Sequence, residues 1–94
     1  MEIRVRSALY ISKILTGRCV TVELEDSQTL GGLLQELTVK YGREFHDAVC
    51  DKEGYAADNV AILINGTSAA AIGGIEARLR DGDEVVILPS IHGG

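Results

Sequence analysis

The chain is poor in the residues that mark several protein classes. Its 94 residues include no tryptophan, one proline and two cysteines, Cys19 and Cys50. Two thiols are too few for a disulfide scaffold or for an iron–sulfur cluster held by cysteines alone. Its apolar runs are far shorter than the roughly 20 residues that span a bilayer. Residues 1–4 also lack the apolar core of a signal peptide. We therefore expect a cytoplasmic protein with no membrane partner.

Positive charge is also scarce, because nine Lys and Arg face 14 Asp and Glu and leave a net charge of −5. An acidic surface repels phosphate backbones, so we expect no nucleic-acid partner. His46 and Cys50 have the spacing of two ligands on one helix face, but two ligands do not make a zinc site, and we predict no metal. No glycine-rich phosphate-binding motif is present, so we predict no cofactor bound by the chain itself.

Hydrophobic periodicity predicts one α+β domain. Residues 2–7 and 18–25 alternate apolar and polar side chains, which predicts two half-buried strands in a hairpin, with residues 9–17 as a loop or wide turn. Leucines and a tyrosine then recur at helical spacing over residues 30–41. Asp26, Ser27 and Thr29 are candidate N-caps of this helix, and Gly42 is its candidate C-cap.

The second half of the chain returns to strands. Residues 43–59 are mostly polar; Phe45, Ala48 and Val49 could anchor a short helix, and residues 54–59 are expected to form an exposed loop. The continuously apolar run Val60–Ile64 predicts a central strand covered on both faces. Asn65-Gly66 favours a type I′ turn, with a short strand near residues 67–70. Asp81-Gly82-Asp83 predicts a turn before a last strand, 84–88, that Pro89 ends. We expect the first and last strands to lie side by side at the centre of the sheet.

One face of the last strand should remain outside the core. If Val85 and Ile87 lie inside, an apolar patch faces outward, formed by Ala61, Leu63, Val86 and Leu88. Such a patch is typical of a protein interface, and coverage by a loop is the alternative.

The end of the sequence carries the chemistry. Six extended residues from Pro89 to Gly94 reach about 20 Å, and Gly93 and Gly94 have no Cβ to obstruct a narrow channel. The terminal carboxylate could therefore enter another protein's active site and attack the α-phosphate of ATP. The resulting acyl-adenylate is open to sulfur or amine nucleophiles. The alternative is a flexible terminus without function.

Three segments resemble the ubiquitin-like sulfur carrier family, which includes the small subunit of molybdopterin synthase (MoaD) and ThiS-like proteins. They are Leu79–Pro89 with the Gly-Gly end, Ile62–Gly66, and the helix of residues 30–41 with its continuation to Phe45. The resemblance implies a ubiquitin-like β-grasp fold, in which a mixed sheet of four to five strands carries one main helix on one face. It implies a β-grasp domain at residues 1–89 and a flexible tail at residues 90–94.

The family also implies a carrier protein that is not itself an enzyme, at most the small non-catalytic subunit of a molybdopterin synthase-like complex. Gly94 would be adenylated by a ubiquitin-activating-type partner that uses ATP and Mg²⁺, and would then become a thiocarboxylate. A synthase large subunit would accept the sulfur. Gly93, His92, Ile91 and Ser90 would thread through the partner, and Leu88, Ile72 and Leu63 would dock on it.

The resemblance leaves the pathway open. Molybdopterin biosynthesis, for the molybdenum or tungsten cofactor, is the first expectation. The alternatives are sulfur transfer for cysteine, thiamine or tRNA thiolation, and conjugation to protein lysines as a ubiquitin-like modifier. His92 stands where molybdopterin carriers usually have a small residue.

Overall fold

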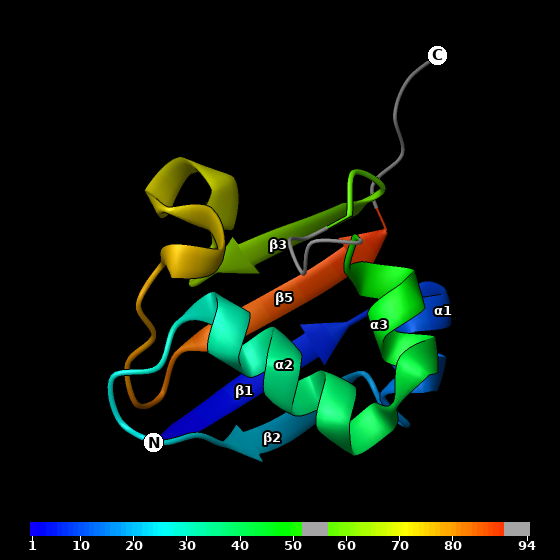
Figure 1. Ribbon diagram of the computed structural model, residues 1–94, viewed down its shortest axis with the longest axis horizontal. Helices are drawn as coiled ribbons and strands as arrows, with labels where there is room; N and C mark the ends of the chain where they lie inside the picture. The colour runs from blue at the N-terminus through cyan, green and yellow to red at the C-terminus, as the bar shows by residue number, and fades with distance from the viewer. Residues whose placement is uncertain (52–56, 90–94) are drawn as a thin grey trace.

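The computed structural model describes residues 1–51 and 57–89 and shows a five-stranded mixed sheet with a long helix across one face (Figure 1). Ten elements follow one another in the described residues: β1 (Glu2–Ser7), α1 (Leu9–Ile14), β2 (Cys19–Glu23), α2 (Leu30–Tyr41), α3 (Arg43–Val49), β3 (Val60–Ile64), β4 (Thr67–Ser68), the 3-10 helices η1 (Ala69–Ile72) and η2 (Gly74–Glu76), and β5 (Glu84–Pro89).

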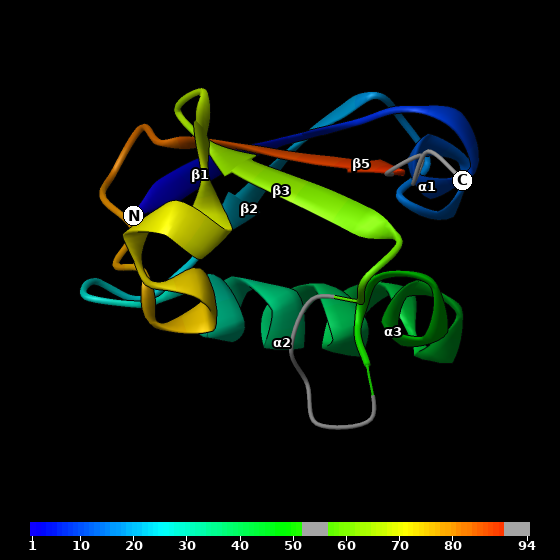
Figure 2. The same ribbon diagram turned by 90° about the horizontal axis from the view of Figure 1, so that it is seen from above.

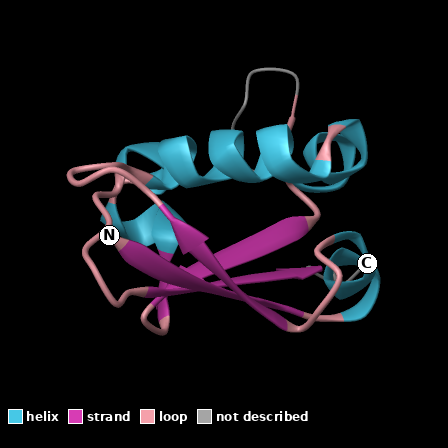
Figure 3. Cartoon of the chain, turned by 90° about the horizontal axis from the view of Figure 1, so that it is seen from below, coloured by secondary structure: helices cyan, strands magenta, loops and turns pink. Residues whose placement is uncertain are grey.

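The strand order is β2-β1-β5-β3-β4, so the first and last strands lie side by side at the centre, as predicted. β1 and β5 run parallel, and every other neighbouring pair is antiparallel. Helices α2 and α3 both lie on one side of the sheet (Figures 2 and 3). This is the α+β ubiquitin-like β-grasp fold that the sequence predicted.

Helix α2 forms because its apolar stripe matches the helical period. Its four leucines are all buried against the sheet. Of the three candidate N-caps, Thr29 is the one used, since its hydroxyl accepts a hydrogen bond from the backbone nitrogen of Gly32 at 3.3 Å. Gly42 ends the helix with a φ of 84°, a conformation that favours glycine. The short helix α3 follows at once and is anchored by buried Phe45 and Val49.

Two local predictions were wrong, and a third gave the right element with too great a length. The segment 9–17 contains helix α1, because Ile11 and Leu15, four residues apart, are both fully buried. Strand β3 is covered on one face only, since Ala61 and Leu63 stay half-buried, and it lies next to the edge. The short strand expected near 67–70 is present as β4, but it ends at Ser68 because η1 begins at Ala69.

Both predicted turns are confirmed. Asn65 and Gly66 have φ values of 51° and 86°, the two positive angles of a type I′ turn. Gly82 has a φ of 87° in the turn before β5. Of the loop expected at 54–59, residues 54–56 lie outside the described part, while Asp58 and Asn59 are exposed. Within the described residues, no helix is long and apolar enough to cross a membrane.

Candidate functional site

The predicted site has two parts, a tail and a face of the sheet. Ser90, Ile91, His92, Gly93 and Gly94 all lie outside the described residues. The acceptor role of Gly94 and the threading role of the four residues before it therefore stay predictions. The face of the sheet and the strand that leads into the tail are both described.

The outward face of the sheet carries the predicted apolar patch. Val85 and Ile87 are fully buried beneath the helices, so the alternating residues Val86 and Leu88 lie on the opposite face, where they are half-buried. The register pairs Val86 with Leu63 and Leu88 with Ala61. The structure thus brings Leu63 and Leu88 together on adjacent strands. We call the four residues Ala61, Leu63, Val86 and Leu88 the open-face patch.

Ile72 does not belong to this patch. It lies on η1 and is 46% exposed. Helix η1 follows β4, which pairs with Leu63 and Ile64 at the end of β3, whereas Leu88 pairs with Ala61 near the beginning of that strand. The predicted docking residues therefore form one patch with Leu63 and Leu88, and a separate exposed position at Ile72.

Charged side chains border the patch on the β1 side. Arg4 and Arg6 alternate with the buried Ile3 and Val5, so both face outward. The Arg6 guanidinium lies 3.5 Å from the Glu84 carboxylate. Because the Arg6 side chain is exposed and Glu84 is only partly buried, this ion pair contributes little to stability. The patch therefore has an apolar centre with a charged margin, as many protein interfaces do.

The strand that leads to the tail is held firmly at its beginning. The Asn65 side-chain amide donates to the Asp83 carboxylate at 2.9 Å, and its oxygen accepts from the backbone nitrogen of Glu84 at 3.0 Å. The backbone nitrogen of Arg80 donates to the other Asp83 carboxylate oxygen at 2.8 Å. The two predicted turns are thus joined by side-chain hydrogen bonds.

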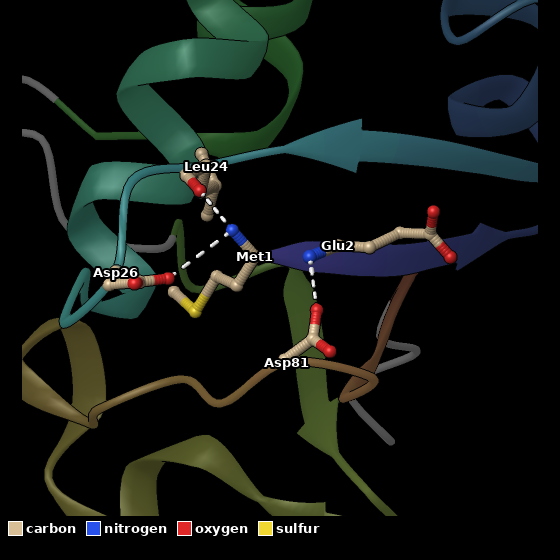
Figure 4. A network of polar contacts seen from close by, with 5 residues as sticks. All are labelled: Met1, Glu2, Leu24, Asp26 and Asp81. Atoms are coloured by element: carbon tan, nitrogen blue, oxygen red, sulfur yellow. Dashed lines mark hydrogen bonds and ion pairs between the residues drawn. The ribbon is translucent and has the colours of Figure 1, made fainter.

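The same turn is tied to the first strand. The backbone nitrogen of Glu2 donates to the Asp81 carboxylate at 2.6 Å (Figure 4). Next to it, the Met1 amino group donates to the carbonyl of Leu24 and lies 3.5 Å from the Asp26 carboxylate. Strand β5 is therefore fixed by β1, by β3 and by its own turn before it reaches Pro89.

The position of this turn was predictable from the sequence, but the hydrogen bonds of its side chains were not. Asn and Asp in turns are a recognisable signal. However, the link from Asn65 to Asp83 spans 18 residues and depends on the neighbouring positions of β3 and β5, which no local pattern reveals.

His46 and Cys50 line a cleft of about 260 Å³ between α2, α3 and η2, together with Gly31, Leu34, Gln35, Thr38 and Ile75. Burial, with a smaller contribution from the Asp51 carboxylate, raises the pKa of the Cys50 thiol. A raised pKa keeps the thiol protonated and makes it a poor nucleophile or metal ligand. Among the described residues, no group of three potential metal ligands comes together.

The chain is similar in sequence and in structure to proteins of a known family. The ThiS family model matches residues 12–94. Small archaeal modifier protein 3 of Haloferax volcanii is 26% identical over the whole of both chains. A protein of Archaeoglobus fulgidus, provisionally named a sulfur carrier, is 29% identical over 70% of this chain and 74% of its own length.

The solution structure of Urm1 from Trypanosoma brucei superposes with a TM-score of 0.81 at 27% identity, covering 99% of this chain and 95% of that one. The fold, the family match and these relatives lead to one conclusion: the chain belongs to the ThiS family of ubiquitin-like sulfur carriers and modifiers.

Proposed function

We propose that this protein is a sulfur carrier whose cargo is bound at the C-terminal carbonyl of Gly94. The chain would not catalyse the reaction itself. A ubiquitin-activating-type enzyme would bind ATP and Mg²⁺ and receive the tail, and this chain would present the carboxylate. The observation that carries the proposal is the family match, which extends through residue 94 and therefore includes the Gly-Gly end.

Two substitutions, the first at phosphorus and the second at the Gly94 carbonyl carbon, would load the carrier. First, a carboxylate oxygen of Gly94 attacks the α-phosphorus of ATP, and pyrophosphate leaves. Second, a sulfur nucleophile held by the partner attacks the carbonyl carbon of the acyl-adenylate, and AMP leaves with the bonding electrons. If the donor is a persulfide, an external thiol or reductant must release the sulfur to give the thiocarboxylate. The carrier is not itself oxidised or reduced.

The rigid sheet supports this role because it fixes the start of the tail. Strand β5 is paired on both sides, and its first residue, Glu84, donates its backbone N–H to Asn65, which is itself hydrogen-bonded to Asp83. A partner that docks on the open-face patch therefore finds Pro89 at a defined position. Docking energy then offsets the entropy lost when a short tail is ordered in a channel.

ATP–pyrophosphate exchange with the cognate activating enzyme tests the first step. We expect exchange with the unaltered chain and none with a chain that lacks Gly94. Leu63→Ser should raise the KM for the chain because it removes apolar area from the patch. Thr21→Ala, which changes an exposed residue on edge strand β2, is the control. Undiminished exchange without Gly94 would refute the proposal.

A second candidate function is conjugation to lysines of other proteins. The name of the full-length Haloferax relative favours it, and the same acyl-adenylate serves an amine nucleophile. Because no Lys or Arg follows Arg80, trypsin would leave the whole segment 81–94 on a modified lysine. A search for this long remnant, with the chain lacking Gly94 as the control, tests the candidate.

For the pathway, we propose molybdopterin biosynthesis first. In the test, the thiocarboxylated chain is mixed with the large subunit of a molybdopterin synthase and with the sulfur-free precursor of molybdopterin, and formation of the dithiolene is measured. Sulfur transfer to this acceptor supports the pathway. If sulfur is transferred only to a precursor of cysteine, of thiamine or of thiolated tRNA, the corresponding pathway would replace molybdopterin biosynthesis as the proposed one.

A further inference from the structure

Helix α1 exposes two large apolar side chains that folding does not explain. Leu9 is 69% exposed and Tyr10 is 42% exposed, whereas Ile11 and Leu15 of the same segment are fully buried. In the described residues only four large apolar side chains are at least 42% exposed, and Leu9 and Tyr10 are the two of them that are consecutive in the sequence. We call them the α1 pair.

The backbone at Leu9 is also unusual. Its φ is 58°, a left-handed conformation that costs free energy for a residue with a Cβ and that glycine adopts freely. Backbone strain of this kind concentrates at binding and catalytic sites. A leucine that is both strained and exposed contributes little to folding, so a role in binding is the better explanation for it.

The sheet places the α1 pair beside the exit of the tail. Strands β1 and β5 are parallel, and Ser7 pairs with Ile87. The carboxyl ends of the two strands therefore lie side by side, and the chain leaves both strands at the same end of the sheet. Leu9 follows Ser7 by two residues, as Pro89 follows Ile87. Helix α1 packs against β5 at this end (Figures 1 and 2).

The length of the tail limits where a partner can dock. Six extended residues from Pro89 to Gly94 reach about 20 Å at most. An enzyme that receives Gly94 must therefore bring its surface close to the end of the sheet where α1 lies. We propose that Leu9 and Tyr10 form a docking contact for the activating enzyme, next to the open-face patch. This inference rests on the proposed function, because that function identifies the enzyme.

Binding without ATP tests the contact separately from the chemistry. The Kd of the full chain for the cognate activating enzyme is measured for the unaltered chain, Leu9→Gly, Tyr10→Ala and Val39→Ala. Val39 is the matched control, since it is 76% exposed on the outer side of α2. We expect each α1 variant to raise the Kd by about tenfold, a typical effect of truncating an apolar anchor, and Val39→Ala to leave it unchanged.

Leu9→Gly separates binding from folding. It removes the side chain but relieves the left-handed backbone, so its melting temperature should equal or exceed that of the unaltered chain while its affinity falls. Equal Kd values for Leu9→Gly and Val39→Ala would overturn the inference. So would concentration-dependent dimerisation that Leu9→Gly abolishes, because a second copy would then cover the pair. A chain that binds normally but supports no ATP–pyrophosphate exchange would refute the proposed function and leave the contact standing.

Discussion

The two cysteines illustrate how position decides the chemistry of identical residues. Cys19 is exposed on edge strand β2, and Cys50 is buried at the end of α3. Burial raises the pKa of the Cys50 thiol. We expect iodoacetamide at pH 8 to alkylate Cys19 well before Cys50, which peptide mapping by mass spectrometry would measure. Equal rates at the two sites would contradict the burial of Cys50.

The same pKa shift predicts how stability depends on pH. A raised pKa means that the folded state holds the Cys50 proton to higher pH than the unfolded state does. The contribution of the protonated Cys50 thiol to the stability of the fold is therefore complete below the ordinary thiol pKa of 9.0. It is lost as the pH rises through the higher pKa that this thiol has in the folded state. We expect the free energy of unfolding to fall above pH 9 more steeply in the unaltered chain than in Cys50→Ala. Parallel pH profiles in urea denaturation would contradict this.

At the scale of elements, the two glycines in the first turn of α2 are not equivalent. A Cβ on Gly31 would lie 3.2 Å from the backbone oxygen of Ile75, so η2 would have to move. A Cβ on Gly32 would meet the end of the Gln28 side chain, which can rotate away. Gly32→Ala should therefore stabilise the protein by up to about 1 kcal/mol through helix propensity, and Gly31→Ala should destabilise it. Urea denaturation of both variants measures the change in the free energy of unfolding. Equal changes of the same sign in the two variants would contradict the prediction.

Most of the secondary-structure elements, but not all, were predictable from local sequence patterns. The strands, helix α2 and its caps, and both turns were predictable because each depends on residues close in sequence. Helix α1 was missed because Ile11 is its one fully buried residue and Leu15 lies just beyond its end, while Leu9 and Tyr10 are apolar but exposed to solvent. The one-sided burial of β3 was missed because it depends on which face of the sheet the helices cover, and this is a long-range property.

Of the candidate site, the open-face patch was predictable from the alternation of Val86 and Leu88 with buried residues. The position of Ile72 outside that patch was not, because η1 follows a strand of only two residues. The contacts of Asn65 with Asp83 and of Asp81 with Glu2 required the tertiary fold, since they join segments far apart in the sequence.

For the whole molecule, we predict that residues 90–94 contribute to function and not to stability. The described core is complete at β5, whose buried residues Val85 and Ile87 precede the tail. A chain that ends at Pro89 should therefore melt at the same temperature as the full chain and support no ATP–pyrophosphate exchange. Differential scanning calorimetry measures the first result. A clearly lower melting temperature would mean that the division at residue 89 is wrong.

The most direct test of the account is intact and fragment mass spectrometry of the chain after incubation with its activating enzyme, ATP, Mg²⁺, a sulfur donor and a thiol reductant. The account predicts exchange of one oxygen for sulfur, located at Gly94 by C-terminal fragments and absent from a chain that lacks Gly94. An unchanged mass with the cognate enzyme, or a sulfur atom added at Cys19 or Cys50 without loss of oxygen, would contradict it.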